Sequence, residues 1–212
     1  MAVRSDNSNA KNSLDLSPHT GGIVIDIGTG DGRFVSKLAA DDPGKFYIGV
    51  DANTKPLEKP SMKATRKPNK GGLPNALFVQ AAVEDLPVEF SHIADEIHIH
   101  FPWGSLLRAM AVGDPDVLFS LRRIASPGCL LEVILGLDPL RDTAEMERLG
   151  IPEITPVFIH SYLVPKYVKA GFELLESRRV TAKEQAGLKT TWAKRLSPNA
   201  DRQVHCLIFQ AT

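Results

Sequence analysis

A glycine-rich segment near residue 30 has the residue types and spacing of a small-ligand site. Residues 26–32 read Asp-Ile-Gly-Thr-Gly-Asp-Gly, so that Asp26 precedes Gly28, Gly30 and Gly32. Glycine lets the backbone turn sharply and lets a ligand approach within contact distance. A nicotinamide-binding fingerprint, G-x-G-x-x-G, would need its third glycine at the position of Arg33. The spacing therefore disfavours a nicotinamide oxidoreductase.

Asp51 extends this predicted site, because it stands about twenty residues farther along, at the end of the second expected strand. A carboxylate at that place can accept hydrogen bonds from both hydroxyls of a ribose. The alternative is that Asp51 only caps the helix that follows it.

The pattern acid-x-Gly-x-Gly-x-Gly is typical of class I S-adenosylmethionine methyltransferases, and residues 26–32 resemble it closely. The resemblance implies S-adenosylmethionine as the cofactor. It also places Glu84, with Val83 beside it, where such enzymes hold the adenine ring. Phe101, Ser105 and Thr190 complete the cofactor site that the resemblance implies.

The elements that position these residues follow from an alternation of apolar runs and helical patterns. Such an alternation predicts crossover units and a mostly parallel sheet, which binds ligands beyond the carboxyl ends of its strands. By similarity we expect the class I methyltransferase (Rossmann-like) α/β fold, with seven strands, helices on both faces and the last strand antiparallel. Strands are expected at 23–27, 46–50, 76–80, 96–101, 129–135, 172–180 and 204–210. Helices are expected at 34–40, 104–112, 115–125, 143–149 and 161–170, with a stretch after Asp51 that Pro56 and Pro60 interrupt.

Composition limits the class of protein. The 212 residues, 43% of them hydrophobic, suffice for one well-buried domain. We expect this domain at 21–212, after a polar lead-in at 1–20. No apolar run approaches the roughly 20 residues that span a bilayer, and no signal pattern is present. Cys129 and Cys206 lie in apolar runs, which predicts reduced thiols in a cytoplasmic protein. No metal site is expected, and we expect a monomer.

The fourth expected strand ends in a second segment suited to chemistry, Phe101-Pro102-Trp103-Gly104. Methylases that act on amino groups carry Asn or Asp at the place of Phe101, which offers no side-chain acceptor. Its backbone carbonyl can still hold an amino group while Trp103 stacks on a base, and this fits methylation of a ring nitrogen. Trp192, the second of two tryptophans, would cover the other face of the base, although core packing is the alternative for each. Stacking returns roughly 1–3 kcal/mol per base, which about offsets the cost of flipping it.

These segments together resemble the aminoglycoside-resistance methyltransferases that modify the position-one nitrogen of a decoding-site adenine in 16S ribosomal RNA. The resemblance is densest at residues 26–33, 67–73, 101–107 and 192–196. It implies that Trp103 and Trp192 stack on the base, with Phe101 and Pro102 beside them, and that Thr190 positions Trp192. It also implies the small ribosomal subunit as partner, with RNA docked before Gly71 and after Trp192.

The chemistry of the residues agrees with this resemblance. The position-one nitrogen of adenine has a lone pair and no proton, so it can attack the sulfonium methyl group without a general base. Catalysis is then positioning, which supplies up to roughly 7–11 kcal/mol. The methylated adenine is cationic, and indole faces attract cations by about 0.5–2 kcal/mol. Two tryptophans would thus favour the transition state over the neutral substrate.

Two basic groups flank the predicted site and give a candidate RNA footprint, although a solvated surface is the alternative. A net charge of zero does not exclude RNA binding, because local patches contact phosphates. The residues predicted to bind RNA are Lys63, Arg66, Lys67, Lys70, Lys194, Arg195 and Arg202.

Two other functions stay open at this stage. Transfer-RNA guanine-N(7) methyltransferases carry a similar Phe-Pro-x-Pro-Trp motif, but its second proline is missing here. A weakly active homologue that binds the ribosome is the other alternative. It is motivated by Ala200, since relatives tend to have an arginine at this place, two residues before the position of Arg202.

Overall fold

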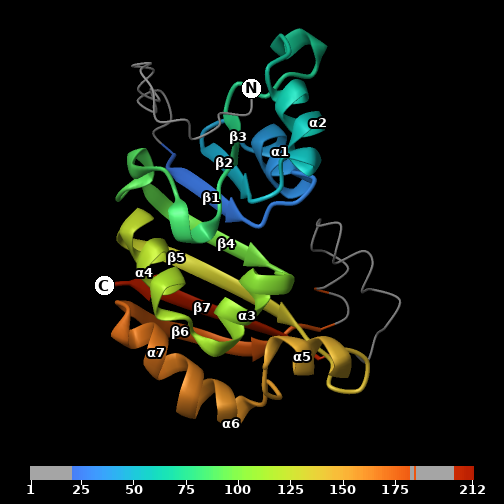
Figure 1. Cartoon of the computed structure of the whole chain (residues 1–212). Coiled ribbons are helices and arrows are strands. Elements are labelled where there is room, and N and C mark those ends of the chain that lie inside the picture. Colours follow the sequence, from blue (N-terminus) through green and yellow to red (C-terminus); the bar gives the residue numbers. More distant parts are fainter. Residues whose placement is uncertain (1–20, 182–183, 185–202) are drawn as a thin grey trace.

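A seven-stranded sheet forms the centre of the computed structural model, which describes residues 21–181, 184 and 203–212. Its strands lie side by side in the order β3-β2-β1-β4-β5-β7-β6 (Figure 1). The β7 strand runs antiparallel to its neighbours β5 and β6, whereas the other neighbouring pairs are parallel. The strands are β1 (Ile23–Ile27), β2 (Phe46–Asp51), β3 (Ala76–Gln80), β4 (Ala94–His100), β5 (Ala125–Gly136), β6 (Phe172–Arg179) and β7 (Val204–Ala211).

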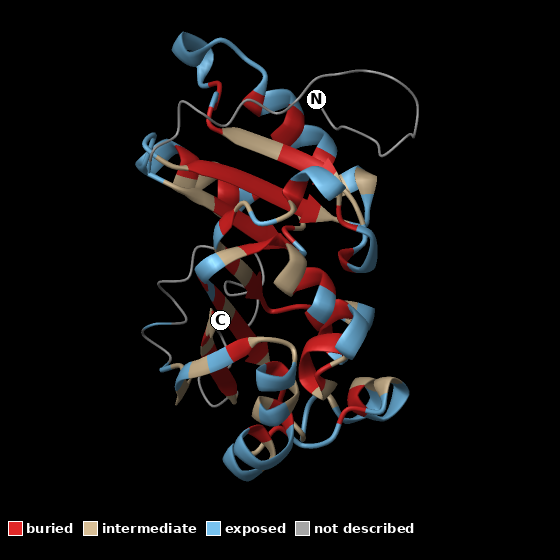
Figure 2. Ribbon diagram, turned by 90° about the vertical axis from the view of Figure 1, so that its left-hand side faces the viewer, coloured by how far each residue is buried: buried red, intermediate tan, exposed pale blue. Residues whose placement is uncertain are grey.

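Helices cover both faces of this sheet, as the alternating pattern predicted. One apolar cluster packs α1 and α2 on the face that Val24, Tyr47 and Phe78 present. A larger cluster packs the remaining helices on the opposite face, and Figure 2 shows the buried residues concentrated along the strands between these layers. The helices are α1 (Arg33–Asp41), α2 (Thr54–Ala64), α3 (Gly104–Val112), α4 (Pro115–Ile124), α5 (Thr143–Leu149), α6 (Pro156–Phe158) and α7 (Val164–Lys169).

The expected class I fold is therefore confirmed, and the differences from it are local. The helix α2 is continuous, although Pro56 and Pro60 were expected to interrupt it. Pro56 lies in the first turn, where backbone N–H groups have no partner within the helix, and Pro60 is buried inside it. The helix expected at 161–170 instead spans α6, a π-helical turn (η4, Ile159–Leu163) and α7. Pro165, at the start of α7, lacks the N–H that a regular α-helix would use there.

The fourth strand separates its two faces by strict alternation. Ile97 and Ile99 are fully buried in the larger apolar cluster. Glu96, His98 and His100 alternate with them and therefore point to the face that carries α1 and α2. A strand at the middle of the sheet thus presents three polar side chains to one layer. In the described part of the chain, no helix is long and apolar enough to cross a bilayer.

One buried amide joins α1 to the neighbouring strands. The side chain of Asn75 is 3% exposed, and its Nδ2 lies 3.0 Å from the carbonyl oxygen of Ala39, 3.2 Å from that of Asp42 and 3.1 Å from that of Lys45. The donor thus satisfies backbone acceptors at the end of α1 and at the start of β2. Such acceptors are costly to leave unpaired in a protein interior.

We expect Asn75→Ala to lower the free energy of unfolding by about 1–3 kcal/mol, because it leaves buried carbonyl groups without a donor. Asn75→Asp should cost more, since it places a carboxylate against the same oxygens. Urea unfolding measures both effects, and the exposed Asn69→Ala is the matched control, expected within about 0.5 kcal/mol of the unchanged protein. A change in Asn75→Ala as small as that of the control would contradict this role of the amide.

Candidate functional site

The strand order brings the loops after β1 and β4 together at one edge of the sheet. β1 lies between β2 and β4 in the sheet. The chain leaves β1 toward the face that carries α1, and it leaves β4 toward the opposite face, which carries α3. At such a reversal of strand order, parallel sheets bind ligands in a crevice beyond the carboxyl ends of their strands, and this is where the predicted cofactor residues lie. The loop after β1 is the glycine-rich turn, and the loop after β4 is the segment 101–104.

The glycine-rich turn is held against the end of β2. The backbone N–H groups of Gly28 and Thr29 donate to the carbonyl oxygen of Val50 at 2.8 and 2.9 Å. The N–H of Gly30 donates to Oδ2 of Asp51 at 2.9 Å. The two predicted parts of the cofactor site are thus joined directly, which the sequence spacing alone did not show.

Two glycines of the turn are required for different reasons. Gly32 has φ +65°, and a Cβ atom there would lie 2.5 Å from the ring of Phe78 and 2.9 Å from Pro60. Gly30 also has positive φ, but a Cβ atom there would meet nothing within 4 Å. Gly32 therefore permits the packing of α1 against the sheet, whereas Gly30 borders open space that a ligand can enter.

The carboxylate of Asp51 has contacts on both sides. Besides Gly30, it accepts hydrogen bonds through Oδ1 from the backbone N–H of Asn53 at 2.8 Å and from its side-chain amide at 3.2 Å. Asn53 immediately precedes α2, so Asp51 also helps to start that helix. A carboxylate offers about four lone-pair sites, and Gly30 and Asn53 occupy three of them, so Oδ2 can still accept one ribose hydroxyl. A second hydroxyl could be accepted at Oδ1 if the side chain of Asn53 turned away.

Asp26 lies beneath the turn and is nearly inaccessible. It is 4% exposed and stands opposite His98 in the register of β1 and β4. Burial raises the pKa of Asp26, while His100 and His98 act in the opposite direction. The ionisation of this acid therefore depends on two imidazoles of the next strand, a relation not foreseen from the sequence.

Those imidazoles belong to a network of charged and polar side chains on β4 and β5. Burial lowers the pKa of His98, but hydrogen bonds to Glu132 and Glu96 outweigh burial and raise it to about 9. The hydrogen bond with His98 is the main cause that lowers the pKa of Glu96 to about 2. Burial raises the pKa of Glu132, and hydrogen bonds with His100 and His98 reverse that effect and hold it well below its usual range.

Other predicted cofactor residues lie in a 3-10 turn after β3 and in the helix after β4. Val83 is buried and Glu84 is exposed, both in a 3-10 turn (η2, Val83–Asp85) after β3. Ser105 is exposed in the first turn of α3. A Cβ atom on Gly28 would lie 2.9 Å from Leu106 of the same helix, so α3 lies close to the glycine-rich turn.

The segment after β4 turns sharply and exposes an indole. Phe101 has φ +49°, a left-handed conformation that is uncommon for residues other than glycine. Its N–H donates to the carbonyl oxygen of Ile134 at 2.9 Å, and its side chain packs with Ile134, Val204 and Cys206. Pro102 is buried as well, whereas Trp103 is 48% exposed. The core-packing alternative therefore does not hold for Trp103, although its role toward a base stays a prediction.

The first group of basic residues lies on a tightly bonded loop. Lys63, Arg66, Lys67 and Lys70 are all exposed, at the end of α2 and in the 3-10 turn η1 (Pro68–Lys70). The N–H of Gly72 donates to the carbonyl oxygen of Lys67 at 3.2 Å, and a Cβ atom on Gly72 would lie 1.8 Å from the carbonyl oxygen of Arg66. Gly72 is thus a structural requirement of this loop that sequence reasoning missed, although the Gly71-Gly72 pair was a signal for it.

Other predicted residues lie outside the part of the chain that the structure describes. They are Thr190, Trp192, Lys194, Arg195, Ala200 and Arg202.

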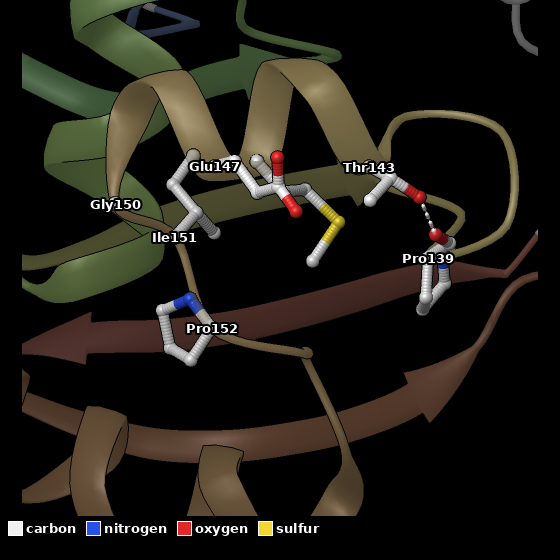
Figure 3. Close-up of a pocket in the computed structure, with 7 residues that line it drawn as sticks. Pro139, Thr143, Glu147, Gly150, Ile151 and Pro152 are labelled. Carbon is white, nitrogen blue, oxygen red and sulfur yellow. Dashed lines mark hydrogen bonds between the residues drawn. The ribbon is translucent and has the colours of Figure 1, made fainter.

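A separate pocket of about 480 Å³ lies beside α5 (Figure 3). The hydroxyl of Thr143 at its rim donates a hydrogen bond to the carbonyl oxygen of Pro139. None of its lining residues was predicted for the cofactor or for RNA, so the pocket is distinct from the crevice above. It is lined by Pro139, Thr143, Met146, Glu147, Gly150, Ile151 and Pro152.

Comparison with known proteins gives a consistent result over nearly the whole chain. Residues 6–211 match the family profile described as 16S rRNA (adenine(1408)-N(1))-methyltransferase. An enzyme of that name from Streptoalloteichus tenebrarius is 39% identical over 180 residues, which are 85% of this chain and 82% of that enzyme.

Solved structures agree with this similarity. The aminoglycoside resistance methyltransferase NpmB1 is 49% identical with a TM-score of 0.83, covering 93% of this chain and 90% of its own. A tryptophan-to-alanine mutant of the 16S rRNA (adenine(1408)-N(1))-methyltransferase from Catenulisporales acidiphilia, solved with its cosubstrate SAM, is 33% identical with a TM-score of 0.84, covering 92% of this chain and 87% of its own. By contrast, a tRNA (guanine-N(7)-)-methyltransferase of Rubrobacter xylanophilus is 30% identical over 38% of this chain and 34% of that enzyme.

Proposed function

Because this chain belongs to the 16S rRNA (adenine(1408)-N(1))-methyltransferase family, we propose that it methylates that position of the small ribosomal subunit and thereby gives aminoglycoside resistance. The methyl donor is S-adenosylmethionine, bound in the crevice between the glycine-rich turn and α3. The observation that carries the proposal is the half-exposed indole of Trp103 at the start of α3, whose Leu106 lies against the turn. A base stacked on that indole lies at the mouth of the crevice.

The reaction needs little from the protein besides geometry. The position-one nitrogen of adenine attacks the methyl carbon, the carbon–sulfur bond breaks, and S-adenosylhomocysteine leaves with the electron pair. No proton moves, so neither a general base nor a metal ion takes part in this step. Holding the two reactants in line can supply up to roughly 7–11 kcal/mol. The positive charge that develops on the base is attracted by the indole face.

Phe101 has a positioning role in this mechanism. Its left-handed backbone and buried ring direct the chain out of the sheet, so that Trp103 is presented to solvent and not to the core. Its backbone carbonyl is a candidate acceptor for the amino group beside the attacked nitrogen. Trp192 would cover the second face of the base, and Thr190 would position Trp192. A base held on both faces and at its amino group has one orientation toward the methyl donor.

The exposed loop that carries Lys63, Arg66, Lys67 and Lys70 supports docking on folded RNA. Phosphate contacts from such a loop position the enzyme without reading the sequence, so the fold of the RNA selects the target. Lys194, Arg195 and Arg202 would extend the same footprint. We further propose that the enzyme acts as a monomer in the cytoplasm, because a single chain supplies every group named above.

The direct test is methyl transfer from labelled S-adenosylmethionine to purified small ribosomal subunits, with the modified nucleotide mapped by primer extension. We expect a stop at the decoding-site adenine. Transfer to guanine in transfer RNA, tested in parallel, would replace the proposal with the guanine-N(7) activity. Binding of S-adenosylhomocysteine without transfer to either RNA would leave a homologue that binds the ribosome but does not methylate it.

Trp103→Ala should lower the rate of methyl transfer by about two orders of magnitude, because stacking is worth roughly 1–3 kcal/mol and the cation attraction adds about 0.5–2 kcal/mol. Trp103→Phe keeps an aromatic face and should retain more of the rate. Affinity for S-adenosylhomocysteine, measured by calorimetry, should stay nearly unchanged in both variants. An equal loss of cofactor affinity would refute the stacking role. Phe119→Ala, at an exposed aromatic residue of α4, is the matched control.

Asp51→Ala should instead weaken S-adenosylhomocysteine binding first, by about 10- to 100-fold. Hydrogen bonds to a charged group are worth roughly 1.5–3 kcal/mol, and each 1.4 kcal/mol is about tenfold. Asp51→Asn keeps an acceptor for the N–H of Gly30 and should lose less. The exposed Asp85→Asn, on η2, is the control for a nearby loss of charge. Unchanged affinity in Asp51→Ala would rule out a contact with the ribose.

A further inference from the structure

Three metal-ligating side chains meet on the sheet face that carries α1, outside the crevice. His98 and His100 alternate along β4, and Glu132 stands directly opposite His98 on β5. Their ligand atoms all lie within 4.8 Å of one another. Glu132 is 32 residues from His100, and the pairing of β4 with β5 brings it to the two histidines.

The distances within this cluster suit a tetrahedral ion. Nδ1 of His98 lies 3.3 Å from Nε2 of His100 and 3.4 Å from Oε1 of Glu132. Ligand atoms at about 2.0 Å from a tetrahedral zinc ion are separated by roughly 3.3 Å. The third separation, from Nε2 of His100 to Oε1 of Glu132, is 2.6 Å and would widen on binding. The side chain of Glu132 is 28% exposed, so a small torsional change provides this.

A second layer of partners already orients one ligand. Nε2 of His98 lies 3.2 Å from Oε2 of Glu96, and the other oxygen of Glu96 accepts a hydrogen bond from Nζ of Lys45 at 2.6 Å. A carboxylate on the far nitrogen of a ligating imidazole is the usual support of a metal site, since it sets the tautomer and the ring orientation. Glu96 can thus hold the Nε2–H of His98 while Nδ1, once it has lost its proton, faces His100 and Glu132.

A bound ion would replace a proton within this cluster. Both ring nitrogens of His98 lie near carboxylates, Nε2 at 3.2 Å from Oε2 of Glu96 and Nδ1 at 3.4 Å from Oε1 of Glu132. Metal binding releases the proton of a ligating imidazole, so a divalent ion would take the place of the Nδ1 proton between His98, His100 and Glu132. Lys45 would keep its ion pair with Glu96, at 2.6 Å, on the far side of His98.

The surroundings of the cluster also fit a bound ion. The ring of Phe34 lies 5.5 Å from that of His98 and 4.9 Å from that of His100, which covers the imidazoles with an apolar wall. The His100 side chain is 3% exposed, and its Nδ1 has no hydrogen-bond partner. The more exposed carboxylate of Glu132 leaves an approach from solvent. Ligands that are mostly buried keep their geometry, and one accessible side allows an ion to enter.

We propose that His98, His100 and Glu132 bind one divalent transition-metal ion of the Zn²⁺ type, with the fourth position open to water. Two imidazoles and a carboxylate form a ligand set that Zn²⁺ accepts readily. The ion would join β4 to β5 and lie close to Asp26, so it stabilises the sheet beneath the glycine-rich turn and takes no part in methyl transfer. This differs from the expectation of no metal, because strand pairing and not sequence spacing assembles the ligands.

The test is Zn²⁺ titration of the full chain after treatment with a chelator, followed by calorimetry. The background carries Cys129→Ser and Cys206→Ser to remove thiols that compete for zinc. We expect one ion per chain, a raised melting temperature in excess Zn²⁺, and a visible absorption spectrum of tetrahedral type when Co²⁺ replaces Zn²⁺. A ligand that binds only the folded state must raise the melting temperature.

The variants separate this site from adventitious binding. Glu132→Gln keeps the shape of the side chain, and like His98→Gln it should abolish the one-to-one binding. Glu96→Gln should keep one ion per chain and weaken the affinity by about 10- to 100-fold, as expected for a second-layer partner. The exposed His160→Gln should bind like the unchanged protein. Absence of one-to-one binding, or equal affinity in Glu132→Gln and His160→Gln, would overturn the proposal.

Discussion

The pairing of β1 with β4 is the constraint on which the arrangement of the site depends. Because β4 lies next to β1 and not next to β3, the strand order reverses at the centre of the sheet. The loop after β1 and the loop after β4 consequently lie at the same edge of the sheet, and the hydrogen bonds from Gly28, Thr29 and Gly30 to the end of β2 fix one side of the proposed site. The left-handed Phe101 fixes the other side. The glycine-rich turn and the segment after β4 are the two halves of the proposed reaction site. Both thus depend on the order β3-β2-β1-β4 of these parallel strands.

The same pairing has an electrostatic consequence on the face of the sheet. Asp26 on β1, His98 and His100 on β4, and Glu132 on β5 all point toward the layer of α1. Strands usually present apolar side chains to a covered face, and here charged groups replace them in the centre. Burial alone would raise the pKa values of these acids, but the imidazoles hold that of Glu132 far below its usual range. The buried charges are therefore interdependent, and each is tolerated because of its neighbours.

Much of the fold could be predicted because the signals were local. The apolar runs of β1 and β3 and the helical patterns of α3 and α5 coincide with the observed bounds. Residue type and spacing likewise predicted the glycine-rich turn after β1 and a tryptophan outside the core at position 103. The left-handed conformation of Phe101, the close contact at Gly72 and the cluster of His98 with Glu132 were not found. Each of these depends on a neighbour brought near by the sheet or by a loop, and no window of sequence contains that information.

The pairing of β6 with β7 continues to the point where the chain leaves one strand and enters the other. Arg179 stands opposite His205, and the N–H of Val180 donates to the carbonyl oxygen of Val204 at 2.8 Å. The chain between these residues therefore departs and returns at fixed, neighbouring points whatever its composition. The pairing of β6 with β7 is therefore set by the strands themselves, and a chimera that exchanges the chain between them keeps these two anchor points, the sheet and the glycine-rich turn.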